Sequence, residues 1–229
     1  MTASPATADA GGHTTQTRIA ERLREAIVQG RFAPGQALKI RDLAEAFGTS
    51  TQPVRGAIKQ LVAEQALQAL PNRSARVPLL ERAKLDDLTR VRIAVEGLAV
   101  ELAAERATAA DVRALRRLLK WRARDEAEHL AGHRDFHFTA YRLADSPTLM
   151  PIIESLWLQL GPYLRQATML VQGQAMEDRH HLALIAALEA HQPLAARKAV
   201  EADIRGSAAL FPGVADEAQS LRWLAAAAP

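Results

Sequence analysis

Between residues 86 and 210 apolar side chains recur at helical spacing, and no strand-like alternation interrupts them. Helix start and stop signals divide this stretch. Helices are predicted to begin at Thr108 with Asp111, at Ser146-Pro147 and at Gln192-Pro193, and the last helix is predicted to end before Phe211-Pro212-Gly213. The pattern predicts six helices, at about residues 85–105, 109–128, 129–145, 148–171, 175–191 and 193–209. Because the connections are short, neighbouring helices are expected to pack antiparallel as a bundle.

The preceding segment has a different organisation. A helical pattern from Thr17 ends at Gly30, and a short helix is predicted at about 40–47. Gly48 fits the left-handed position after that helix, and a second helix begins near Ser50 or Thr51 with a hydroxyl as its cap. Two strand-like segments, 66–70 and 75–77, then flank a turn. This order of helices and ribbon is that of a winged helix-turn-helix.

The fold class that follows is mostly α, with an N-terminal winged helix-turn-helix that carries a small β-ribbon and a C-terminal antiparallel helical bundle. The sequence predicts a disordered leader at residues 1–13 and a DNA-binding domain at 14–78. A linker at 79–85, a helical domain at 86–211 and a tail at 212–229 follow.

Charge is distributed unevenly between the two predicted domains. Residues 14–78 carry ten Lys and Arg against five Asp and Glu, whereas residues 79–229 carry nineteen against twenty. Only the first domain is therefore expected to meet a polyanion such as double-stranded DNA. The chain has no Cys, no secretory leader and no apolar run long enough for a membrane helix, which predicts a cytoplasmic protein without membrane contact.

The second helix of a helix-turn-helix pair places its first residues against base edges in the major groove. Those residues are Ser50, Thr51, Gln52 and Arg55, and Gln and Arg can pair in a bidentate way with adenine and guanine. Contacts to phosphate or to an adjacent groove are predicted for Arg41 on the preceding helix and for Arg73, Ser74 and Arg76 on the ribbon. The alternative is that these groups are only solvated surface.

Residues 16–78 resemble the DNA-binding domain of GntR-type regulators. The resemblance rests on Pro34-Gly35, on the PxVR element at Pro53–Arg55 and on the PNRxARV wing at Pro71–Val77. Residues 86–210 resemble the FCD domain of the FadR subgroup, through Arg92 followed by Glu96, through HRDFHFTAYRLADSP and through RHHLALIAALEAHQPLAARKAVEADI.

The FCD resemblance implies a metal site. In that family one Asp and three His often hold a divalent metal ion in the bundle. Here the Asp position is occupied by His133, His137 and His181 follow, and the position of the last His is occupied by Asp203. The total of three imidazoles and one carboxylate is unchanged, and this set suits Zn, the expected metal, or Ni, Co or Fe. His129 is expected to face solvent.

The resemblance also implies a homodimer that binds a palindromic operator, in most such families as a repressor, and that senses a small organic acid. Arg92 and Arg165 are the candidates to bind the effector carboxylate, although an ion pair between Arg92 and Glu96 is an equal alternative. Tyr141, Trp157 and Tyr163 are expected to fill the core. Two other functions stay open: a helical metalloenzyme that uses the His and Asp site, for which the sequence offers no general base, and a metal-free regulator.

Overall fold

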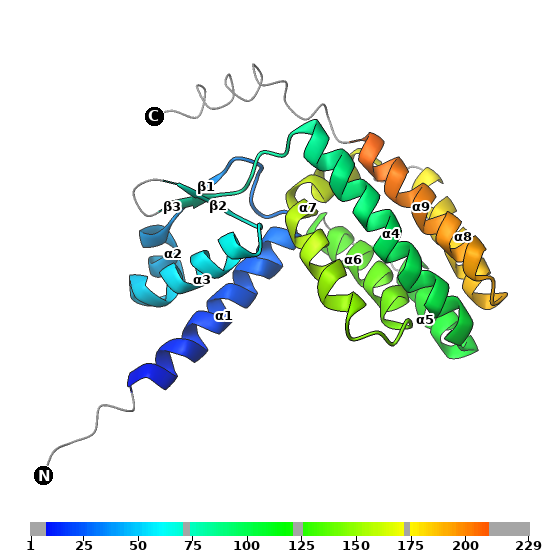
Figure 1. Ribbon diagram of the computed structural model, residues 1–229, viewed down its shortest axis with the longest axis horizontal. Coiled ribbons are helices and arrows are strands. Elements are labelled where there is room, and N and C mark those ends of the chain that lie inside the picture. The colour runs from blue at the N-terminus through cyan, green and yellow to red at the C-terminus, as the bar shows by residue number, and fades with distance from the viewer. Residues whose placement is uncertain (1–7, 71–73, 121–125, 172–174, 211–229) are drawn as a thin grey trace, which may run out of the picture. The chain divides into compact units, whose positions relative to one another are not determined.

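The structure is a computed structural model that describes residues 8–70, 74–120, 126–171 and 175–210, and within them all side chains except those of 8–14, 126–127, 165–171 and 175–178. In chain order the elements are α1 (Ala8–Val28), β1 (Ala37–Lys39), α2 (Ile40–Ala46), α3 (Thr51–Ala63), β2 (Gln68–Leu70), β3 (Ser74–Arg76), α4 (Arg82–Arg106), α5 (Ala109–Lys120), α6 (Glu126–Arg142), α7 (Leu149–Val171), α8 (Ala175–Glu189) and α9 (Pro193–Ala209) (Figure 1). The mostly helical fold class is confirmed.

The chain divides into two compact units. The first contains the described residues up to Leu79 together with Leu158–Pro162, and the second contains Leu80–Trp157 and the described residues from Tyr163 onward. None of the described helices combines the length and the hydropathy needed to span a bilayer.

The first unit is a helix-turn-helix with a small sheet. Its core is formed by apolar side chains that α1, α3 and the sheet direct inward, among them Leu23, Ile27, Val54, Leu61 and Ala75. Gly48, after α2, has a φ of +61°, so the predicted left-handed position is confirmed.

The ribbon differs from its prediction in strand number. The sheet has three antiparallel strands in the order β1-β3-β2, with Leu38 paired to Ala75 and Ala69 paired to Ala75 from the other side. Strand β1 was not predicted, because its three residues are too few for an alternation to be recognised.

Three helix starts also differ. Helix α4 begins at Arg82, inside the predicted linker, rather than near residue 85. Helix α1 begins at Ala8, inside the segment predicted to be disordered, because residues added to an existing helix require no new nucleation. Helix α6 begins at Glu126 rather than near residue 129.

The second unit is the predicted helical bundle. Helix α4 packs against α9 and α6, α9 packs against α8, and α5 packs against α6 and α8 (Figure 1). The predicted start of α5 is confirmed as a capping box, since the Thr108 backbone N–H donates to Asp111 and the Asp111 backbone N–H donates to the Thr108 hydroxyl. The stop predicted at Phe211-Pro212-Gly213 lies outside the described residues.

Candidate functional site

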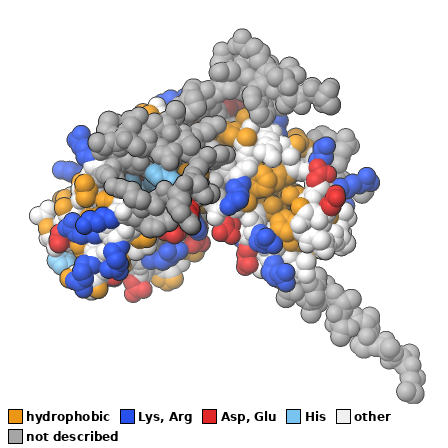
Figure 2. Space-filling model, turned by 180° about the vertical axis from the view of Figure 1, so that it is seen from behind, with side chains coloured by type: hydrophobic (Ala, Val, Ile, Leu, Met, Phe, Trp, Pro, Cys, Tyr) orange, Lys and Arg blue, Asp and Glu red, His pale blue; other side chains and the backbone are white. Residues whose placement is uncertain are grey.

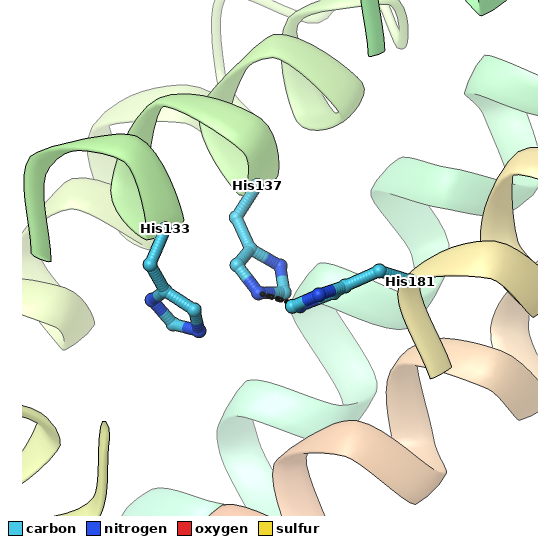
Figure 3. A group of neighbouring side chains, drawn as sticks. All are labelled: His133, His137 and His181. Atoms are coloured by element: carbon cyan, nitrogen blue, oxygen red, sulfur yellow. Dashed lines mark hydrogen bonds between the residues drawn. The ribbon is translucent and has the colours of Figure 1, made fainter. Parts of the chain in front are cut away.

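Three histidines from two helices of the bundle point toward one another. His133 and His137 stand one turn apart on α6, and His181 reaches them from α8 (Figure 3). One ring nitrogen of each lies within 4.8 Å of the others, and the Nε2 atoms of His137 and His181 are 3.2 Å apart. His137 and His181 are almost fully buried, whereas His133 is partly exposed.

A carboxylate from a third helix completes the group. Asp203 on α9 lies with Oδ2 3.5 Å from His137 Nε2 and with Oδ1 3.7 Å from His181 Nε2. Its side chain is 15% exposed, so solvent reaches the group from this side. The structure therefore brings together side chains that are separated by up to 70 positions in the sequence.

The surroundings keep His133 and His137 neutral. Burial lowers the pKa of both His133 and His137 well below the usual value, and the neighbouring imidazoles lower it further. Burial also raises the pKa of Asp203 to about 6, although the positive charge of Arg92 opposes that shift. Neutral imidazole is the form that binds a metal ion, because the coordinating nitrogen must carry a lone pair.

The donor set fits a divalent metal ion. Two nitrogen ligands at about 2.0–2.1 Å from one zinc ion stand about 3.1–3.4 Å apart when the coordination angle is close to tetrahedral. The separation of the two Nε2 atoms, 3.2 Å, lies in this range. A hydrogen bond between one protonated and one unprotonated nitrogen has the same separation, so the distance alone does not require a metal.

Behind His137 lies a buried polar network, of which the sequence indicated only the Arg92–Glu96 ion pair, as an alternative to effector binding. Tyr141 Oη is 3.1 Å from His137 Nδ1 and donates to Glu96 Oε2 at 2.6 Å. Glu96 also accepts from Arg92 Nε at 2.5 Å and from Arg92 Nη2 at 3.1 Å. The Trp157 ring lies against the Arg92 guanidinium and the His133 and His137 rings. Tyr141 and Trp157 are core residues, as predicted, but they also border the site.

Of the two candidate effector-binding residues, Arg92 and Arg165, the structure describes the side chain of Arg92 alone. Arg92 makes the ion pair that was the alternative to effector binding, and only 4% of its surface is exposed. The side chain of Arg165 lies outside the described part of the chain. His129, expected to face solvent, is instead half-buried with a fully buried Nε2 atom, because it lies one helical turn before His133 on the same face of α6.

The predicted DNA contacts lie around the start of α3. Arg41, Ser50, Thr51 and Gln52 are exposed and Arg55 is half-buried. Ser50 holds the cap position, but its hydroxyl makes no capping hydrogen bond, so the predicted cap is wrong in that detail.

On the wing, Ser74 and Arg76 are half-buried at the two ends of β3, and Arg76 donates to Gln68 on β2. Arg73 lies outside the described residues. Lys and Arg side chains occur on the visible faces of both units, so basic surface alone does not locate a DNA interface (Figure 2).

Comparison with known proteins assigns a family to each part of the chain. The family described as bacterial regulatory proteins, gntR family, matches residues 15–77, and the FCD domain matches residues 87–206. The chain is 32% identical to the HTH-type transcriptional regulator McbR of Escherichia coli (strain K12) over 181 residues, which cover 76% of this chain and 81% of that protein.

Two further comparisons agree. The HTH-type transcriptional repressor GlaR of Escherichia coli (strain K12) is 29% identical over 72% of this chain and 81% of its own length. The solved structure of E. coli McbR/YncC superposes with a TM-score of 0.75 at 28% identity, and covers 86% of this chain and 96% of that chain. These relatives are transcription regulators, which sets aside the metalloenzyme alternative.

Proposed function

Because this chain belongs to the gntR family of bacterial regulatory proteins and carries an FCD domain, we propose that a divalent metal ion in the helical unit anchors its small-molecule effector. The protein is a DNA-binding transcription regulator that responds to a ligand.

The observation that carries the metal proposal is the convergence of His133, His137 and His181 with Asp203. Three neutral imidazoles and one carboxylate suit Zn, and also Ni, Co or Fe(II). The family pattern has a carboxylate where His133 stands and an imidazole where Asp203 stands. We propose that His133 and Asp203, with the imidazole and the carboxylate exchanged between the two positions, form the same kind of donor set.

The effector is proposed to be a small carboxylic acid. A tetrahedral metal held by three protein ligands, or one that expands beyond four ligands, retains a position that water or an oxygen ligand can fill, and a carboxylate oxygen is suited to it. Arg92 and Arg165 remain candidates to bind a second part of the effector. In Arg92, Nε and Nη2 already donate to Glu96, so any effector contact would use the remaining N–H groups.

We propose that the protein acts as a homodimer on a palindromic operator, with Arg41, Ser50, Thr51, Gln52, Arg55, Arg73, Ser74 and Arg76 at the DNA. Two-fold symmetry in the protein matches two-fold symmetry in the operator. A preference of the effector for one arrangement of the DNA-binding units by about 1–3 kcal/mol would change operator occupancy several-fold to a hundredfold. GlaR is named a repressor, and we propose repression here as well.

Elemental analysis tests the metal proposal directly. We expect about one divalent metal per chain in protein purified without a metal-binding tag, and loss of that metal in His133→Ala and Asp203→Ala. The control is His191→Asn, since His191 contacts Ala104 rather than the site and has a φ of +49°, which Asn tolerates. A wild-type protein that stays metal-free after addition of Zn or Ni would overturn the proposal.

A further inference from the structure

Tyr141 connects the histidine cluster to a buried carboxylate, and its surface is entirely covered. It lies one helical turn beyond His137 on α6, so both side chains share one face. Its hydroxyl lies between His137 Nδ1, at 3.1 Å, and Glu96 Oε2 on α4, at 2.6 Å. Glu96 is itself fully buried and pairs with Arg92 through two hydrogen bonds.

The direction of each hydrogen bond in this series is fixed by chemistry. The carboxylate of Glu96, which pairs with the guanidinium of Arg92, can only accept. The single O–H of Tyr141 must therefore donate to Glu96. The contact between Tyr141 and His137 then requires a proton on His137 Nδ1, which leaves a lone pair on Nε2.

That lone pair faces the candidate metal position. The Nε2 atom of His137 points toward His181 Nε2 at 3.2 Å and Asp203 Oδ2 at 3.5 Å. An unprotonated nitrogen beside a carboxylate oxygen places two electron pairs opposite each other, an arrangement that a shared cation stabilises.

We propose that Tyr141, oriented by the Glu96–Arg92 ion pair, is a positioning residue that fixes the tautomer and ring orientation of His137 so that Nε2 can bind the metal. This inference rests on the proposed metal function. It assigns to Arg92 and Glu96 a role behind the metal ligand. Second-layer partners that hold ligating histidines in this way typically change metal affinity by about 10–100-fold.

The test compares two buried tyrosines. Tyr141→Phe removes the hydroxyl between His137 and Glu96. Tyr163→Phe removes a buried hydroxyl that accepts from the Leu80 backbone N–H at 2.7 Å. Zinc affinity is measured by competition with a chromophoric chelator, and the tautomer of His137 is read from its imidazole ¹⁵N shifts in the metal-free protein.

We expect Tyr141→Phe to weaken zinc binding by about 10-fold or more and Tyr163→Phe to leave it within about twofold. In the wild type the ¹⁵N shifts should show the proton on Nδ1 of His137, and in Tyr141→Phe they should show a mixture of tautomers. A merely structural hydroxyl would lower stability without moving the tautomer.

The inference is overturned if the wild-type proton lies on Nε2 of His137, or if Tyr141→Phe changes neither the tautomer nor the zinc affinity. Failure of the metal proposal is distinguishable from this result. A wild-type protein that binds no zinc overturns that proposal, while the tautomer in the metal-free protein still decides the role of Tyr141.

Discussion

Replacement of Arg92 by Met should strongly destabilise the helical unit even when no effector or metal is bound. Arg92 and Glu96 form a hydrogen-bonded ion pair whose side chains are 5% and 0% exposed. Met retains an unbranched apolar chain but removes the charge and the donors, so Glu96 keeps only the Tyr141 hydroxyl among its described partners. Removing one partner of a buried ion pair typically costs about 3–5 kcal/mol, because the remaining charge stays buried.

The assay is urea unfolding of the metal-free protein, followed by tryptophan fluorescence. All three tryptophans, Trp121, Trp157 and Trp223, follow residue 79, so their emission reports the part of the chain beyond the DNA-binding unit. With an m-value of about 2 kcal/mol/M, the expected loss lowers the urea midpoint by about 1.5–2.5 M. A double-mutant cycle with Glu96→Gln completes the design. The double variant should lose at least about 2 kcal/mol less than the sum of the single losses, because it leaves no unpaired charge.

The same measurement separates the two roles considered for Arg92. A buried arginine that awaits an effector carboxylate would be an unpaired charge in the free protein, and its removal would raise the free energy of unfolding. A loss below about 1 kcal/mol for Arg92→Met, or strict additivity in the cycle, would refute the reasoning from the ion pair.

Two other predictions concern the DNA and the metal. Arg55→Ala should abolish specific operator binding measured by fluorescence anisotropy, while the far-UV circular dichroism stays unchanged. The reason is that Arg55 lies in the first turns of α3 but does not belong to the fully buried core. Unchanged affinity would show that α3 is not part of the interface. Asp203, with a pKa of about 6, should contribute about 0.8 proton to the release on zinc binding at pH 5.5 and almost none at pH 7.5, because its carboxyl is largely protonated only at the lower pH, whereas His133 and His137 are already neutral. Calorimetry in buffers of different ionisation enthalpy measures the number of protons released. A release of equal size in Asp203→Asn would contradict the assignment of this proton to Asp203.

Local sequence signals predicted which helices and strands exist better than they predicted the residues at which these elements begin and end. Gly48 and the pair Thr108 and Asp111 act through their own backbone neighbours, so their positions in the structure follow from a few adjacent residues. Strand β1 exists because it pairs with β3, whose residues lie more than 30 positions later. Pairing over that separation leaves no periodic pattern in three residues.

The candidate site shows the same division between local and distant information. His133 and His137 share a helical face, which their spacing alone indicates, and the family resemblance supplied His181 and Asp203. The contact of Tyr141 with His137 also follows a spacing of four, and that signal was available. Its second contact, with Glu96, joins residues 45 positions apart on α6 and α4, and only the packing of these helices brings the two groups together.

The charges of the proposed site favour an anionic effector. With a divalent ion bound, the two positive charges of the metal are offset by one negative charge from Asp203, and the charges of Arg92 and Glu96 cancel. Since an imidazole that binds a metal ion is neutral, one net positive charge remains among mostly buried groups. A monocarboxylate bound to the metal would neutralise it, whereas a neutral ligand would leave it in a poorly solvated place. The exchange of His133 and Asp203 relative to the family pattern does not alter this balance, because the numbers of imidazoles and carboxylates stay the same. It changes which helix carries the negative ligand, so the carboxylate now lies on α9, within 4 Å of both His137 and His181, rather than on α6.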